Sequence, residues 1–155
     1  MNERFMREAI RLSAVKMRQS GGGPFGAVIV QGEKIIGRGW NRVTVVNDPT
    51  AHAEVNAIRA ACRRLKTFSL AGCEIYASCE PCPMCLAAIY WARLNKVYFA
   101  NTRQDAARAD FDDDWIYREV GCPISDRKIP LQQLLQPEAV RIFAEWVALP
   151  EKITY

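Results

Sequence analysis

The sequence has little histidine, no long apolar run and little net charge. His52 is the single histidine among 155 residues, so any site that needs an imidazole must use it. No run approaches the ~20 apolar residues of a membrane-spanning helix, so no membrane partner is expected. The 21 basic and 17 acidic residues give a net charge of +4, which by itself does not indicate nucleic acid or a membrane surface as partner.

The N-terminal segment also lacks the apolar stretch of a secretory signal, because charged residues recur through its first 11 positions. Six cysteines without such a signal favour a reducing, cytoplasmic location and point to metal binding or catalysis rather than disulfides. The length and the ordinary globular composition predict one domain, 1–155.

Hydrophobic periodicity predicts strands that alternate with helices, hence an α/β fold with parallel pairing after a first hairpin. Strands are expected at 25–30, 34–40, 73–77 and 96–100. Helices are expected at 2–19, 48–65 (with Asp48 or Thr50 as N-cap), 82–93, 103–109, 113–119 and 137–147. The segment from Gly121 to Pro137 contains three prolines and separates the last helix from the rest.

Two short segments carry the chemistry: His-Ala-Glu at 52–54 and Pro-Cys-Pro-Met-Cys at 81–85. They offer one imidazole (His52), two thiols (Cys82 and Cys85) and one spare carboxylate (Glu54). A closed structural zinc site takes four protein ligands, whereas a catalytic zinc site takes three and keeps one position for water. This inventory therefore predicts a catalytic zinc site.

Both segments fall at expected helix N-termini, where the positive end of the helix favours thiolates. Cys82 and Cys85 fall near N-cap and N3, on one side of the first turn. Zinc lowers the pKa of a bound water to about 7, and Glu54 is placed to accept and return its proton.

Two other kinds of metal site fit the sequence less well. Cys79, Cys82 and Cys85 have the spacing that begins a ferredoxin run, but the fourth position of that run is Ile89 rather than cysteine. A purely structural zinc would leave Glu54 without a role. Cys79 is expected to be structural, and the remaining cysteines small buried hydrophobes.

At these residues the chain resembles the zinc-dependent cytidine/deoxycytidylate deaminase superfamily. The likeness to its guanine-deaminase branch runs nearly from end to end, and is carried by 22–30, 47–54, 79–92, the Phe-Asp-Asp at 111–113 and the terminal Tyr155. It implies a three-layer α/β/α sandwich with a mixed five-stranded sheet and helices on both faces. It also implies one Zn²⁺ per chain and hydrolysis of guanine to xanthine and ammonia, with zinc-bound hydroxide attacking C2 and Glu54 as proton shuttle.

By position, the resemblance implies that Asn41 hydrogen-bonds the purine and that Phe25 and Trp91 pack on it. It implies that Asp113 binds the edge of the purine and assists proton transfer, and that Tyr155 closes the pocket. It further implies a homodimer that exchanges its C-terminal segment, 121–155, so that Asp113 or Tyr155 serves either its own site or the partner's. Each of these residues also has a structural interpretation: a turn cap, core aromatics, a solvated helix start or a frayed terminus.

An acidic stretch, 110–114, supports this substrate on chemical grounds. Guanine presents N1–H and a 2-amino group as a row of donors, and a carboxylate such as Asp113 is an acceptor-only partner. The stretch would also repel phosphate, which disfavours nucleotides and nucleic acids. Two residues depart from the family pattern, since Asp110 and Ala87 stand where glycines are expected.

Several alternatives remain open at the level of sequence. A tRNA adenosine deaminase shares the zinc motif, but RNA binding favours a basic face or tail that this chain does not show. Guanosine, cytosine and aminotriazines are further substrates of the same chemistry. A zinc-stabilised interaction module would be indifferent to loss of Glu54.

Overall fold

The computed structural model describes residues 2–111 and 113–154, apart from the side chain of Ser20. Contacts divide the chain into two units, residues 1–117 and 118–155.

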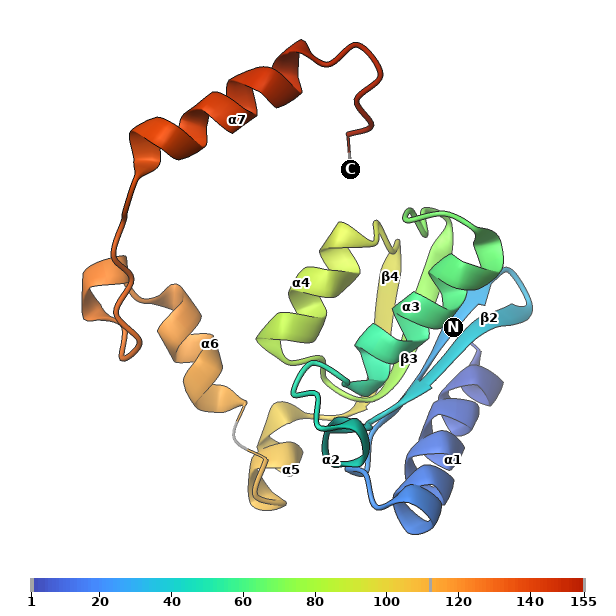
Figure 1. Ribbon diagram of the computed structural model, residues 1–155. Coiled ribbons are helices and arrows are strands. Elements are labelled where there is room, and N and C mark those ends of the chain that lie inside the picture. The colour runs from blue at the N-terminus through green and yellow to red at the C-terminus, as the bar shows by residue number, and fades with distance from the viewer. Residues whose placement is uncertain (1, 112, 155) are drawn as a thin grey trace. The chain divides into compact units, whose positions relative to one another are not determined.

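A mixed sheet forms the centre of the first unit (Figure 1). Its strands are β1 (Gly26–Gln31), β2 (Lys34–Trp40), β3 (Cys73–Cys79) and β4 (Lys96–Asn101), in the order β2-β1-β3-β4. β1 pairs antiparallel with β2 and with β3, and β3 pairs parallel with β4. The predicted α/β class and the parallel pairing after the hairpin are therefore confirmed.

The predicted number of strands is wrong, because the sheet has four strands, not five, in the part of the chain that the structure describes. After β4 the chain turns into helices instead of returning to the sheet. These are α5 (Arg103–Arg108), α6 (Asp114–Gly121), the short 3-10 helix η1 (Ile124–Asp126) and α7 (Gln136–Ala148).

Each face of the sheet has its own core. Strand side chains alternate between faces, so neighbours along β1 enter different clusters. Val28 and Val30 pack with Phe5 and Leu12 of α1 (Glu3–Ser20). Ala27 and Ile29 face the opposite side with buried residues of α3 (Ala53–Leu65) and α4 (Pro83–Trp91). Helices thus cover both faces, as expected.

The approach of α3 to the sheet depends on glycine. A Cβ on Gly39 of β2 would lie 2.1 Å from the Ala53 carbonyl oxygen and 2.4 Å from the Ala57 nitrogen. Gly37, two residues earlier on the same strand, lies under the Ala57 carbonyl in the same way. These two glycines let the backbone of α3 contact β2 directly. This contact fixes the distance between the sheet and the start of α3, next to His52.

The start of α3 differs from the prediction. The helix begins at Ala53 with His52 as N-cap, not at Asp48 or Thr50. The Asp48 carboxylate instead accepts hydrogen bonds from the Thr50 backbone N–H (2.8 Å) and hydroxyl (2.7 Å), so it closes a turn before the helix. A short helix that was not predicted, α2 (Val43–Val46), precedes this turn.

The second unit contains η1 and α7, with the end of α6 at its start. α7 exposes large apolar side chains, and those of Val140, Phe143 and Val147 share one helical face. Within residues 2–111 and 113–154, none of the helices has both the length and the apolar content that crossing a bilayer requires.

Candidate metal and substrate site

Two helix N-termini bring the predicted metal ligands together. His52 is the N-cap of α3, Cys82 is the N-cap of α4 with Pro83 in the next position, and Cys85 lies in the first turn of α4. The His52 Nδ1 atom is 3.5 Å from the Sγ atom of Cys82 and 3.5 Å from that of Cys85. Among the described residues, these three form the one group of ligand side chains close enough to share a metal ion.

The spacing of these atoms fits zinc. With Zn–S near 2.3 Å and Zn–N near 2.0–2.1 Å, a tetrahedral ion separates its nitrogen and sulfur ligands by about 3.6 Å. The distance of 3.5 Å from His52 Nδ1 to each sulfur agrees with that edge. Three protein ligands leave the fourth position of a tetrahedral ion for water, so the donor set is that of a catalytic site rather than a closed structural one.

The two thiols are not equivalent. A hydrogen bond from the Cys85 thiol, together with the neighbouring His52, lowers the pKa of Cys82 to about 4. The same neighbouring thiolate and burial raise the pKa of Cys85. The hydrogen bond to Cys82 raises the pKa of His52. Without a metal ion, the site therefore favours Cys82 as thiolate and Cys85 as thiol. A cation bound between the three ligands would favour ionisation of Cys85 as well.

Glu54 stands beside the ligands without belonging to their group. Its side chain is buried, and Cys85 donates a hydrogen bond of 3.5 Å to its Oε2 atom. Burial raises the pKa of Glu54 to about 7, although hydrogen bonding from its own backbone and the nearby His52 oppose the shift. A carboxyl group that changes protonation near neutrality can both accept and donate a proton.

A cavity of about 200 Å³ opens at this point. Its walls come from the end of β2, the N-termini of α3 and α4 and the segment after α5. The lining residues are Phe25, Asn41, His52, Ala53, Glu54, Glu80, Cys82, Asp110, Phe111 and Asp113. Four of these ten described residues carry carboxylates and none of the ten is lysine or arginine, so the cavity is acidic.

The polar and aromatic walls are held in place. The Asn41 Oδ1 atom accepts hydrogen bonds from the backbone N–H groups of Gly23 and Val43, each 3.2 Å. Phe25 packs edge to face on Phe111, with ring centroids 4.7 Å apart and an angle of 81° between the rings. The two rings thus form a single apolar wall.

The structure brings most of the predicted residues together. Phe25, Asn41 and Asp113 line the cavity with His52, Glu54 and Cys82, and Cys85 adjoins them. This placement is consistent with the roles that the resemblance implies, which stay predictions.

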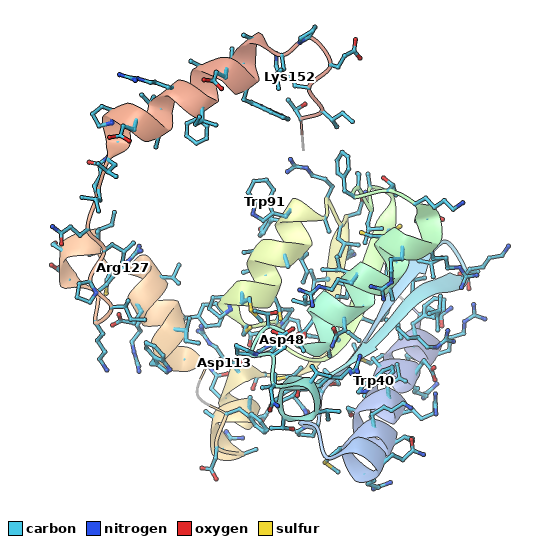
Figure 2. All side chains as sticks on the ribbon, viewed as in Figure 1. Trp40, Asp48, Trp91, Asp113, Arg127 and Lys152 are labelled. Carbon is cyan, nitrogen blue, oxygen red and sulfur yellow. The ribbon has the colours of Figure 1, made fainter. Side chains whose placement is uncertain are left out.

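Trp91 is not brought to the cavity. It is the last residue of α4, 61% exposed, at the opposite end of the helix from Asp113 in Figure 2. The cavity adjoins the first turn of this nine-residue helix, so the helix length separates the two. Tyr155 lies outside the described residues.

Glu80 and Phe111 line the cavity although neither was predicted as a site residue, whereas Asp110 lines it as part of the acidic stretch 110–114. Both had a signal in the sequence, because Glu80 lies between Cys79 and Cys82 and Phe111 lies within that stretch. Asp110 has φ +63°, the left-handed conformation that a glycine adopts without strain and that aspartate tolerates. Ala87, the other departure, is exposed within α4.

Cys79 is separate from the ligand group. Its Sγ atom donates to the Thr102 carbonyl oxygen at 3.6 Å, and burial raises the pKa of this thiol to about 11. Cys79 therefore stays protonated at neutral pH, as a structural residue would.

Comparison with known proteins defines the class. Residues 1–101 match the family model described as the cytidine and deoxycytidylate deaminase zinc-binding region, and the chain belongs to this family of zinc-dependent deaminases. The family and the His/Cys/Cys group together identify the cofactor as one zinc ion per chain.

Individual relatives narrow the class. The guanine deaminase of Bacillus subtilis is 48% identical over 154 residues, which is 99% of each chain. The crystal structure of guanine deaminase from Bacillus subtilis superposes with a TM-score of 0.96 at 49% identity, covering 100% of this chain and 99% of that one. A tRNA-specific adenosine deaminase of Aquifex aeolicus is 46% identical over 98 residues, 63% of this chain and 64% of its own.

Proposed function

We propose that this protein is a cytoplasmic guanine deaminase, which hydrolyses guanine to xanthine and ammonia. The observation that carries the proposal is the similarity to the Bacillus subtilis guanine deaminase over 99% of both chains, including the region after β4. The adenosine deaminase of Aquifex aeolicus matches over 98 residues alone. Six free cysteines support a reducing compartment.

The size and charge of the cavity support a free base as substrate. Its volume of about 200 Å³ is below the ~300–1,000 Å³ of sites that enclose drug-sized ligands. Glu80, Asp110 and Asp113 stand in its wall and would repel a phosphate group. A small, acidic cavity therefore suits guanine better than a nucleotide or an RNA strand.

Recognition of guanine would rest on three side chains. The Asp113 carboxylate accepts from the N1–H and 2-amino donors, an edge that adenine and cytosine do not present. Because two backbone amides occupy the Asn41 oxygen, its amide NH₂ is left to donate to a purine acceptor. The Phe25 ring packs against the base. Trp91, which does not line the cavity, and Tyr155, which is outside the described residues, stay predicted contacts.

The reaction requires proton movement that Glu54 is placed to perform. His52, Cys82 and Cys85 would hold the zinc ion, which when bound would supply the Lewis acidity that makes water a nucleophile at neutral pH. Glu54 takes up the proton that this water loses as its oxygen bonds to C2 of guanine. Glu54 then gives that proton to the ring and afterwards transfers the proton of the new C2 hydroxyl group to the 2-amino group, which leaves as ammonia, so that water and guanine account for both products.

A homodimer that exchanges the segment 121–155 completes the proposal. Large apolar side chains of this segment are exposed, among them Leu134 at 80% and Phe143 at 72%. Exposed apolar area of this kind favours burial against another surface. A second copy of the chain is the proposed surface, with Tyr155 or Asp113 serving the partner's site.

Ammonia release from a panel of substrates tests the proposed function. The panel holds guanine, guanosine, cytosine, adenine and a tRNA anticodon stem-loop. Guanine should be turned over with the highest kcat/KM. Turnover of the stem-loop instead would identify a tRNA deaminase, and guanosine as the better substrate would overturn the argument from cavity size.

Asp113→Ala tests the recognition of the guanine edge. The variant should lose guanine turnover by at least tenfold while it retains zinc, since Asp113 is not in the ligand group. Glu3→Ala, on the exposed side of α1, removes a carboxylate that does not line the cavity and should change neither. Parallel loss of zinc and turnover in Asp113→Ala would show a structural role.

Subunit mixing tests the exchange. Glu54→Gln chains and chains that end at Thr154 should each be inactive alone, and mixed dimers should recover part of the activity. Verified mixed dimers without recovery would show that each site is built from one chain.

A further inference from the structure

The short loop that carries the first thiol ligand is held by a tyrosine from α6. The Tyr117 hydroxyl donates a hydrogen bond of 2.5 Å to the carbonyl oxygen of Pro81. Pro81 immediately precedes Cys82, so this carbonyl belongs to the peptide group that leads into the ligand. None of the residue roles above includes Tyr117.

This loop has few backbone donors of its own. Pro81 and Pro83 flank Cys82, and proline has no N–H group, so neither can donate a hydrogen bond to a neighbouring strand or loop. Cys82 has no side-chain capping bond at the start of α4. Pro81 is buried, and its carbonyl needs a partner within the protein. The Tyr117 hydroxyl supplies that partner.

Tyr117 is itself fixed by the segment after β4. The Arg103 guanidinium lies over the Tyr117 ring, 4.9 Å from its centroid. The backbone N–H of Arg103 donates to Glu80 Oε2 at 3.0 Å, and the Glu80 N–H donates to the Asn101 carbonyl at 2.8 Å. The loop and the tyrosine are therefore tied to the same short stretch of chain.

We infer that Tyr117 is a positioning residue for the metal site: its hydroxyl fixes the Pro81–Cys82 peptide and so holds the Cys82 thiol at zinc-binding distance from His52. The inference rests on the zinc site of the proposed function, but not on guanine as the substrate. Groups that orient metal ligands from outside the ligand set change metal affinity by about 10–100-fold when they are removed. Because Tyr117 acts through the backbone of the loop, we expect its effect on zinc affinity to lie near the lower end of this range.

Tyr117→Phe tests this role, because phenylalanine keeps the ring beside Arg103 and removes the hydroxyl alone. Tyr90→Phe is the matched control, since Tyr90 lies on the exposed side of α4 and the same atom is removed. Zinc affinity is measured by competition with a chromophoric chelator, and the ligand geometry by the thiolate-to-metal absorption of the cobalt-substituted protein. Thermal unfolding of the metal-free protein is recorded for all three proteins.

Tyr117→Phe should bind zinc about tenfold more weakly, with a shifted cobalt spectrum, and Tyr90→Phe should match the parent in both. Parent-like zinc affinity and spectrum in Tyr117→Phe would overturn the inference, whether or not its metal-free form is less stable. These readouts do not involve guanine. A parent protein that binds zinc but does not deaminate guanine would therefore contradict the proposed function without affecting the inference about Tyr117.

Discussion

Replacing Gly39 by alanine should displace the catalytic helix from the sheet. The added Cβ would lie 2.1 Å from the Ala53 carbonyl oxygen and 2.4 Å from the Ala57 nitrogen, whereas ordinary van der Waals contact begins at 3.4 Å. Both atoms belong to the backbone of α3, so no side chain can rotate to make room. The helix must therefore move away from β2 by roughly 1 Å.

Two consequences follow from a displacement of that size. Overpacking in a well-packed core costs about 1–3 kcal/mol of unfolding free energy, and contact with rigid backbone points to the upper half of that range. Misplacing a reacting group by about 1 Å costs up to ~10²-fold in rate. Because His52 caps α3 and Glu54 lies in its first turn, we expect the loss of turnover to exceed what the stability change alone explains.

Urea unfolding, zinc content and kcat/KM for ammonia release measure the two effects separately. Val28→Ala is the matched control, because Val28 is fully buried on the other face of the sheet, against α1. It should lose roughly 2 kcal/mol of stability and keep nearly parental kcat/KM at a temperature where it remains folded. If the kcat/KM of Gly39→Ala is within about twofold of the parent value, the idea of a rigid link between β2 and α3 is refuted. An equal loss of activity in both variants would show that turnover merely follows stability.

Three further outcomes are expected. Glu54→Gln should keep its zinc and lose about 10²–10⁴-fold in turnover, measured as ammonia release beside metal analysis; an active variant would remove Glu54 from proton transfer. Removing zinc with a chelator should abolish ammonia release and lower the unfolding midpoint, and added zinc should restore both; full activity without metal would contradict the assigned site. Hydrogen bonds from Arg11 and Arg38 lower the pKa of Glu8 from 4.5 to about 2. The stabilisation is thus complete above pH 4.5 and lost as the pH falls towards 2, and because both arginines are about half exposed it is worth about 1 kcal/mol. Glu8→Gln should flatten the decline of unfolding free energy in that window, and an unchanged acid limb would show that the pair contributes nothing.

The local pattern of the sequence was sufficient to place the strands and the metal ligands. Each strand combines an apolar run with flanking turn residues, and the ligand segments lie at helix starts where a proline or a polar N-cap marks the boundary. Cys82 as N-cap with Pro83 after it is confirmed for this reason. The fold class followed from the alternation of strands and helices, which depends on neighbours in sequence.

Features that depend on distant contacts were predicted less well. Asp48 and Thr50 are good N-cap residues by type, but they bond to each other and leave that role to His52. Glu80 and Phe111 reach the cavity because β3 and the segment after α5 end at the same place, and one sequence alone does not show this meeting. The fifth strand was carried over from the family, and the local sequence after β4 forms helices instead.

The protonated state of Cys79 has a practical consequence for chemical labelling of this protein. Alkylating reagents attack thiolates, and a thiol with a pKa of about 11 is ionised in about one molecule per thousand at pH 8. Cys79 will therefore remain unmodified, whereas Cys82 will react with the reagent unless a bound metal ion protects it. Counting the modified cysteines before and after chelation is therefore a direct assay of metal occupancy. It works because the thiols of Cys79, Cys82 and Cys85, which are close in sequence, differ in pKa through their surroundings.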